Sequence, residues 1–219
     1  MKKIHPIFIL FIPILLFTTC EQDRIKVSEV IISEERSIES FEQVIIEGIA
    51  NVYLEYDENT SLIVEANDNI IDRIRTTSDG RNLRIETDFE LKNYDKATID
   101  VYVTNPKLSV LMNEGIGDIS IRDFEDLEEL RIMNEGVGNI EVRGTAKQLT
   151  LNTSGVGEFN GFNFLVTTCV AQQSGVGNIE VNVEDDLRGE LSGVGHIYYK
   201  GNPEINVQRT GVGTVIDAN

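Results

Sequence analysis

A Gly-aliphatic-Gly motif occurs six times in the second half of the chain, and this repeat limits the fold more than any other feature of the sequence. The first glycines of the motifs follow one another at steps of 21, 19, 20, 18 and 18 residues. The middle residue is Ile116 in the first motif and valine in the other five. The glycine pairs are Gly115 and Gly117, Gly136 and Gly138, Gly155 and Gly157, Gly175 and Gly177, Gly193 and Gly195, and Gly211 and Gly213. A period of about 20 residues is typical of solenoids, in which each unit stacks on the one before.

Each unit is predicted to be one coil of a parallel β-helix. A polar residue and an apolar-x-apolar triplet follow most motifs, as in NIEV at 139–142 and 178–181. This alternation favours strands, and Pro203 argues against a helix in the fifth unit. A unit of about 20 residues holds two or three short strands with corners, in coils about 4.8 Å apart. We expect the glycines at the corners, where they adopt backbone conformations closed to other residues, and the central valine and following apolar pair to point inward.

A nucleotide-binding loop is an alternative interpretation of these motifs. A dinucleotide fingerprint needs a third glycine, at the sixth position of G-x-G-x-x-G. That position holds Ser120, Glu141, Asn160, Glu180, Tyr198 or Ile216, so the fingerprint is absent from every repeat.

Calcium-binding toxin repeats are a second alternative, but their units have nine residues and a regular aspartate. Here the period is about twice as long. The residue after the second glycine is polar without being consistently acidic: Asp118, Asn139, Glu158, Asn178, His196 or Thr214. No cofactor is predicted, and binding of divalent cations to the acidic surface is left open.

Residues 38–110 lack the repeat and are predicted to cap the N-terminal end of the solenoid, which would otherwise expose its core and strand edges. Strands are expected within 41–56, 61–66, 81–87 and 97–104. Residues 48–51 resemble a degenerate first corner. The stretch NDNIIDRIRT at 67–76 predicts one or two turns of helix.

The N-terminus predicts export and a lipid anchor. Lys2 and Lys3 precede an apolar run, Ile7 to Phe17, and Cys20 follows. We predict a signal peptide at 1–19 that is cut before a lipidated Cys20; a plain secretory signal with an incidental cysteine is the alternative. A charged tether at 20–37, which also offers an edge strand, would then join the head domain at 38–219. That domain divides into 38–110, the N-terminal strands and cap, and 111–219, the Gly-Val-Gly coils.

The charge of the mature chain excludes some partners. Residues 1–19 contain two lysines and no acidic residue, so 17 basic and 37 acidic residues remain, a formal charge of 17 − 37 = −20. The sequence has no basic stripe, so nucleic acid is not expected as a partner. An anionic membrane surface would repel the domain, so the lipid on Cys20 is the expected membrane attachment.

Candidate catalytic residues are few. With Cys20 acylated, Cys169 is the last thiol and cannot form an internal disulfide; its apolar neighbours predict a small buried side chain. His196 is the histidine left in the mature chain and is expected to be a stacked corner residue. β-Helix polysaccharide hydrolases and lyases need paired carboxylates, or calcium with a basic residue, in a groove. Adjacent acidic residues occur at Asp57-Glu58, Glu128-Glu129 and Asp185-Asp186, in expected turns, where solvated charges are ordinary.

The order of these segments resembles a known family. The stretch FEQVIIEG and then NVYLEY, LIVEA, NLRIET and IDVYV precede serial GVGNIEV motifs. This arrangement, over about residues 36–217, resembles the head GIN domain of putative auto-transporter adhesins, a domain of unknown function common in lipoproteins and secreted proteins of Bacteroidetes. The resemblance implies a right-handed β-helix-like fold at the cell envelope and brings no catalytic residues. Because no membrane barrel follows Asn219, the chain is not expected to be an autotransporter.

Three classes of function follow. The first is a non-catalytic binding or adhesion module on an outer-membrane-anchored lipoprotein, with an unknown protein or glycan ligand. Its expected contact strip is the polar column Asp118, Asn139, Glu158, Asn178, His196 and Thr214, for which solvated corner residues are the alternative. A structural or signalling spacer is the second class, and a carbohydrate-active enzyme is the third. The tyrosines that could contact a glycan do not recur at the period: Tyr53, Tyr56, Tyr94, Tyr102, Tyr198 and Tyr199. The face of the outer membrane and a homo-oligomeric state are left open.

Overall fold

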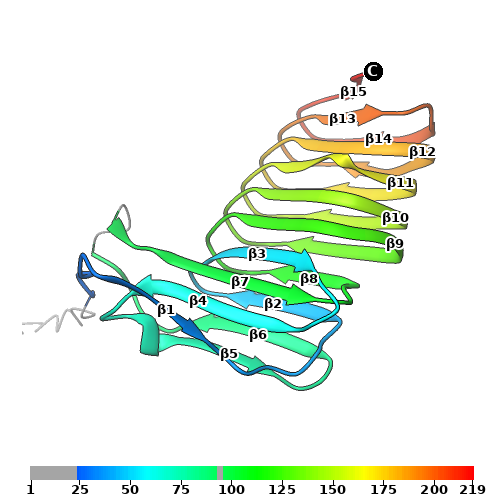
Figure 1. Ribbon diagram of the computed structural model, residues 1–219. Helices are drawn as coiled ribbons and strands as arrows, with labels where there is room; N and C mark the ends of the chain where they lie inside the picture. Colours follow the sequence, from blue (N-terminus) through cyan, green and yellow to red (C-terminus); the bar gives the residue numbers. More distant parts are fainter. Residues whose placement is uncertain (1–23, 93–95) are drawn as a thin grey trace, which may run out of the picture.

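The computed structural model describes residues 24–92 and 96–219, which form an elongated all-β molecule (Figure 1). The predicted signal peptide at 1–19, Cys20 and Tyr94 lie outside the described residues. The strands are β1 (Ile31–Glu35), β2 (Gln43–Glu47), β3 (Asn51–Tyr56), β4 (Ser61–Asn67), β5 (Ile74–Ser78), β6 (Asn82–Thr87), β7 (Ile99–Asn105), β8 (Val110–Asn113), β9 (Ile119–Asn134), β10 (Ile140–Thr153), β11 (Phe159–Gln173), β12 (Ile179–Leu191), β13 (Ile197–Lys200), β14 (Glu204–Arg209) and β15 (Val215–Asp217).

The second half is a β-solenoid of about five turns with coils of about 20 residues, so the predicted fold class is confirmed. Strands β9 to β12 are long, bend around the solenoid and pair in parallel, each with the next along the chain. Strands β13 and β14 both pair with β12, and β15 pairs with β13. The long strands bend where their register shifts. Near these bends Asp123 and Asp126 have positive φ angles of 64° and 55°, which aspartate tolerates better than most residues.

The core consists of side chains that stack from coil to coil. Alternate residues of a strand point to opposite faces, and parallel pairing in register puts equivalent residues above one another. The first apolar residue after each of the first five motifs is buried in this way: Ile119, Ile140, Phe159, Ile179 and Ile197. A second buried column contains Leu130, Leu149, Cys169 and Leu187.

The central residue of each motif points outward, so the prediction that it points inward is wrong. These side chains are 47–51% exposed in the first five motifs, and Val212 is 71% exposed. Each central residue pairs with the next through a single parallel bridge. The flanking glycines lie against the backbone of the preceding coil, which leaves the valine side chain on the outside of the corner. We call the exposed row Ile116, Val137, Val156, Val176, Val194 and Val212 the aliphatic stripe.

The N-terminal part continues two faces of the solenoid as two layers of strands (Figure 1). In one layer the order is β1-β4-β7-β3, and β3 joins β9 in parallel. In the other layer β2 lies between β6 and β8, and β8 joins β9 in parallel. Strands β4 and β5 pair antiparallel with their neighbours at the outer ends. Gly48 begins a first corner, because its φ is +117° and Ile49 bridges to Ile116, as the sequence indicated.

The helix predicted over 67–76 is a single 3₁₀ turn, η1 (Ile71–Arg73). The chain enters β5 directly after it and pairs antiparallel with β6. Ile70, Ile71 and Ile74 are buried, as an amphipathic helix would also place them. Because β6 offers a free edge, the backbone from Ile74 onward forms sheet hydrogen bonds in place of helical ones.

The segment before residue 38 lies against the domain over much of its described length. Strand β1 (Ile31–Glu35) pairs antiparallel with β4 and forms the edge of its layer. Upstream, Ile25 forms a parallel bridge with Leu91. The backbone N–H of Ser28 donates to Asn69 Oδ1 at 2.9 Å. Part of the predicted tether is therefore a structural element of the head.

Candidate functional site

The corner glycines allow the coils to approach closely. An alanine Cβ at the first glycine of each motif would lie 2.0–2.2 Å from a carbonyl oxygen of the preceding coil, although φ at these residues lies outside the positive range. At the second glycine φ is +139° to +155°, and a Cβ would lie 1.7–2.0 Å from such an oxygen. The second glycine is thus required for both close approach and conformation. The first glycine is required for close approach alone, so the prediction that the corner glycines adopt conformations closed to other residues is wrong for this position. The motif is a stacking device and leaves no cradle for a phosphate.

The residues of the predicted contact strip form a hydrogen-bonded ladder along one face. Asn139 donates its backbone N–H to Asp118 Oδ1 at 2.8 Å, and Glu158 donates its N–H to Asn139 Oδ1 at 3.0 Å. His196 donates its N–H to Asn178 Oδ1 at 3.0 Å. Asp118, Asn139, Asn178 and His196 thus each accept the backbone N–H of the equivalent residue in the next coil, whereas Glu158 accepts from the Asn178 side chain at 3.4 Å. We call the set Asp118, Asn139, Glu158, Asn178, His196 and Thr214 the polar ladder.

The candidate nucleophile and base are both in structural positions. Cys169 is free and 1% exposed, and burial raises its pKa to about 12, so the thiol stays protonated at neutral pH. His196 belongs to the polar ladder: its Nδ1 accepts the backbone N–H of Thr214 at 3.3 Å. Its ring lies 5.8 Å from the Tyr198 ring, tilted by 52°. Neither residue contacts the other.

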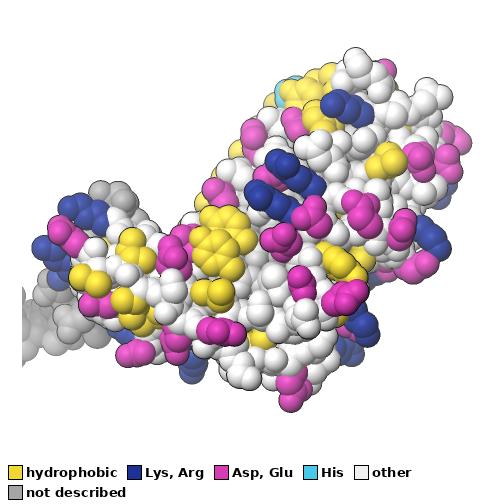
Figure 2. Space-filling model, in the orientation of Figure 1, with side chains coloured by type: hydrophobic (Ala, Val, Ile, Leu, Met, Phe, Trp, Pro, Cys, Tyr) yellow, Lys and Arg dark blue, Asp and Glu magenta, His cyan; other side chains and the backbone are white. Residues whose placement is uncertain are grey.

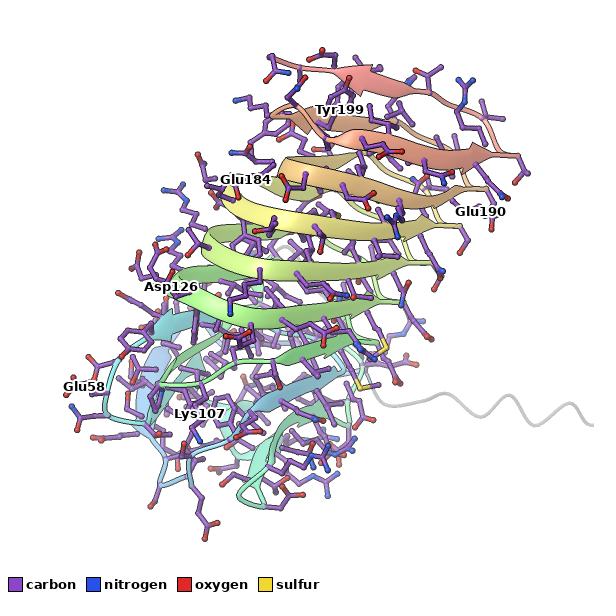
Figure 3. The ribbon with its side chains drawn as sticks, turned by 90° about the vertical axis from the view of Figure 1, so that its right-hand side faces the viewer. Glu58, Lys107, Asp126, Glu184, Glu190 and Tyr199 are labelled. Atoms are coloured by element: carbon purple, nitrogen blue, oxygen red, sulfur yellow. The ribbon has the colours of Figure 1, made fainter. Side chains whose placement is uncertain are left out.

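The adjacent acidic residues face solvent. Glu58 lies in the turn after β3, and Figure 3 shows its side chain at the outer edge of the molecule. The other two pairs lie within the bent strands β9 and β12, contrary to the expectation of turns. Glu128 binds Lys147 at 2.6 Å, and Asp186 pairs with Arg188. Among the described residues, no group of His, Cys, Asp and Glu has a geometry that could hold a metal ion.

A stacked tyrosine pair lies on the face that carries the polar ladder. Tyr53 of β3 and Tyr102 of β7 occupy paired positions, with ring centroids 4.8 Å apart and planes 12° from parallel. Tyr102 is 41% exposed, and its other neighbour, Ile63 of β4, is 40% exposed. On the opposite side, Tyr53 pairs in register with Ser120 of β9. Figure 2 shows the resulting hydrophobic cluster on this face, bordered by acidic and basic side chains.

A hollow of about 270 Å³ lies beside the Tyr53 ring. Its lining consists of Tyr53, Asp118, Ile119, Ser120, Arg122, Asn139, Glu141 and Asn160. Ser120 is small and buried, so the coil at this point leaves space between Tyr53 below and Glu141 above. Sequence reasoning missed this site because the tyrosines do not follow the repeat period. The sequence does contain a signal for the site: NVYL at 51–54 and DVYV at 100–103 share one pattern. When the two segments pair in register, this pattern places Tyr53 beside Tyr102.

The surroundings keep both phenols neutral. Burial raises the pKa of Tyr53, and the carboxylates of Asp100 and Asp118 raise it further, against a smaller opposing effect of Arg122. Burial also raises the pKa of Tyr102, with added effects from Asp100 and Glu65. Since the ordinary value is near 10, each hydroxyl keeps its proton at physiological pH and donates or accepts hydrogen bonds.

A family model described as "Putative auto-transporter adhesin, head GIN domain" matches residues 40–203, well over half of the chain. No curated protein matches the sequence at a significant level. In the described part of the chain, no helix is both long enough and apolar enough to cross a membrane.

Solved structures share the fold over most of their length. A putative adhesin from Bacteroides fragilis NCTC 9343 is 26% identical, with a TM-score of 0.72 over 88% of this chain and 99% of its own. A putative lipid binding protein from Parabacteroides distasonis ATCC 8503 is 20% identical, with a TM-score of 0.55 over 89% and 100%. A putative adhesin from Parabacteroides merdae ATCC 43184 is 16% identical, with a TM-score of 0.51 over 90% and 100%. The last two similarities concern the fold alone.

Proposed function

Because the chain belongs to the family of the putative auto-transporter adhesin head GIN domain, we propose that it is a non-catalytic binding module of the bacterial cell envelope. The observation that carries this proposal is the long face formed by β1, β4, β7, β3 and the following coils. The polar ladder and the exposed Ile63 and Tyr102 side chains lie on it. A contiguous exposed apolar cluster with a polar border is typical of a binding surface.

Binding is favoured over catalysis by the placement of the reactive groups. Cys169 is buried with a raised pKa, and His196 is engaged in the polar ladder. The acidic pairs face solvent, and Lys147 and Arg188 form ion pairs with Glu128 and Asp186, one member of each of two pairs. A glycosidase needs two carboxyl groups on either side of a bound sugar, at about 5–9.5 Å from each other. None of the three adjacent pairs lines the hollow beside Tyr53, so they do not provide that arrangement there.

The binding test uses the full-length protein, purified in a detergent without a sugar headgroup, on printed arrays of glycans and of surface and matrix proteins. Selective, saturable binding to one class of ligand is expected. The alternative role as an envelope spacer predicts no selective binding to either array. Incubation with neutral and acidic polysaccharides, with and without calcium, should release no fragments. Reproducible depolymerisation that is lost on mutating one acidic pair would replace this proposal with an enzyme.

The proposal includes attachment to the outer membrane through a lipid on Cys20. The support is the basic start, the apolar run from Ile7 to Phe17 and the cysteine that follows. Labelled palmitate should enter the wild-type protein and not the Cys20→Ala variant. The Cys169→Ala variant is the matched control and should label like wild type, because that thiol is buried. Equal labelling of all three proteins, or release of wild type into the medium, would contradict the lipid anchor.

A further inference from the structure

The hollow beside Tyr53 has one aromatic wall. One face of the Tyr53 ring lies against Tyr102, with the planes 12° from parallel. The opposite face is therefore turned toward the next strand, where the register partner is Ser120. A serine side chain does not fill the space that a longer residue would occupy. The π-face of an aromatic ring is negative and attracts C–H groups that carry partial positive charge.

The rim of the hollow consists of polar groups in fixed positions. Arg122 Nε donates to Ser120 Oγ at 2.9 Å, and its Nη2 lies 3.9 Å from Glu141 Oε2. Asp118 Oδ1 accepts from both the backbone and the side-chain nitrogen of Asn139, at 2.8 and 3.2 Å. These bonds hold the side chains in place before any ligand arrives. The second carboxylate oxygen of Asp118 and further N–H groups of Arg122 are not used in these bonds.

One planar amide at the rim has no partner. Within residues 24–92 and 96–219, the side chain of Asn160 makes no hydrogen bond, although it lines the hollow and is partly buried. Its register partner on β10 is Glu141, the upper wall of the hollow. A partly buried amide without a partner is satisfied by a ligand that offers both a donor and an acceptor, as a hydroxyl group does.

We propose that this hollow binds one uncharged pyranose residue of a glycan, with its C–H face on the Tyr53 ring and its hydroxyls on Asp118, Arg122 and Asn160. The size fits a single sugar ring, because pockets for drug-sized ligands start at about 300 Å³ and this one holds about 270 Å³. Two carboxylates and one guanidinium line the hollow, and the chain carries a net charge of −18. These charges disfavour uronic and sialic acids. This inference rests on the proposed binding function and specifies its ligand class.

The first experiment measures binding of the full-length protein to a printed array of neutral and acidic glycans. The methyl glycosides of glucose, galactose, mannose and glucuronic acid then serve as competitors for the array glycan that binds. We expect a neutral glycan to bind, and one neutral methyl glycoside to displace it where the glucuronide does not. Displacement by the glucuronide alone would overturn the inference.

Three variants locate the site. Tyr53→Ala removes the wall and should weaken binding about tenfold or more, whereas Tyr53→Phe keeps the ring and should bind within about threefold of wild type. Ser120→Leu fills the hollow while leaving Tyr53 in place, and should also abolish binding. Tyr198→Ala is the matched control. Tyr198 occupies the position on β13 that corresponds, through the strand register, to Ser120 on β9, but it lies outside the hollow, so its loss should leave the affinity unchanged. Circular dichroism checks that each variant is folded.

The outcomes separate this inference from the proposed function. Glycan binding that survives both Tyr53→Ala and Ser120→Leu overturns the site but leaves a binding module. Binding to proteins or peptides without any glycan overturns the ligand class and likewise leaves a binding module. Absence of binding on every array overturns both proposals together.

Discussion

Replacing Gly175 with alanine tests whether the repeated glycines are required for close approach between coils. Its φ lies outside the positive range, so alanine meets no conformational penalty there. A Cβ would lie 2.1 Å from the Gly155 carbonyl oxygen, 0.9 Å short of the 3.0 Å limit that real Cβ contacts respect. The same oxygen accepts the backbone N–H of Val176 at 3.0 Å. Moving it away by nearly 1 Å breaks that hydrogen bond. The clash and the lost bond predict a destabilisation of about 2–4 kcal/mol.

Two other glycines separate close approach from conformation. Gly80 has a φ of +78°, and a Cβ there would lie 3.4 Å from its nearest neighbour, the Glu39 carboxylate. Gly80→Ala should therefore show only the conformational penalty, about 1–2 kcal/mol. Gly177 combines a φ of +147° with a Cβ 1.8 Å from the Gly157 oxygen. Gly177→Ala should be the most destabilising of the three.

The assay is guanidinium-induced unfolding followed by circular dichroism under identical conditions, with free energies compared between variants. The expected order of stability is wild type, Gly80→Ala, Gly175→Ala and Gly177→Ala. A Gly175→Ala variant within about 0.5 kcal/mol of wild type, or more stable than Gly80→Ala, would refute the close-approach argument. Such a result would mean that neighbouring coils can move apart without losing their hydrogen bonds.

Three further predictions concern single residues. Asn139→Ala removes the acceptor for the Glu158 N–H and should destabilise the protein by about 0.5–1.5 kcal/mol in the same unfolding assay. Asn139→Asp keeps that acceptor but replaces the side-chain donor to Asp118 with a like charge, so it should also be less stable than wild type at neutral pH and recover stability as the carboxylates are protonated; unchanged stability of both variants would contradict the ladder. Hydrogen bonds from the Asn82 side chain and from the backbone of Asn82 and Arg81 lower the pKa of Asp79 to about 2. Because the folded value is below the unfolded one, this carboxylate contributes stability above about pH 4, and the contribution is lost as pH falls toward 2. An NMR titration should show that low value, and Asn82→Ala should raise it; an unshifted Asp79 would contradict the hydrogen-bond assignment. The Cys169 thiol, with its pKa raised to about 12 by burial, should not react with Ellman's reagent at pH 8 until denaturant is added, and rapid labelling of the native protein would contradict its burial.

The period of the repeat predicts the fold because stacking requires it. Glycine motifs at steps of 18 to 21 residues, most of them followed by a polar residue and an apolar-x-apolar triplet, leave few arrangements other than stacked coils. The inward position of Ile140 and Ile179 follows from strand alternation. The alternation of inward and outward side chains along a strand does not continue through the corner itself. The outward direction of Val137 and Val176 depends on how the flanking glycines lie against the coil below, and a single sequence does not contain that information.

The candidate site was harder to predict because it combines residues from unrelated segments. Tyr53 and Tyr102 are 49 positions from each other in the sequence, and neither belongs to the repeat. Their contact depends on β3 pairing between β7 and β9, a choice of neighbours that local pattern does not determine. The hollow depends in addition on Ser120, whose importance lies in its small size. The helix predicted at 67–76 failed for the same kind of reason, because β6 offered sheet pairing to a segment with helical periodicity.

The nearest-neighbour pairing of the coils also bears on how such a protein changes its length in evolution. Strand β10 pairs with β9 on one side and β11 on the other, and its corner repeats the contacts of the corner below. An in-frame duplication of one repeat therefore inserts a coil that meets the same contacts above and below, and a deletion removes one without leaving a mismatch. Each event changes the height of the molecule by about 4.8 Å. The height of the solenoid can thus vary in small steps, while the face with Tyr53 and Tyr102 at its N-terminal end stays as it is.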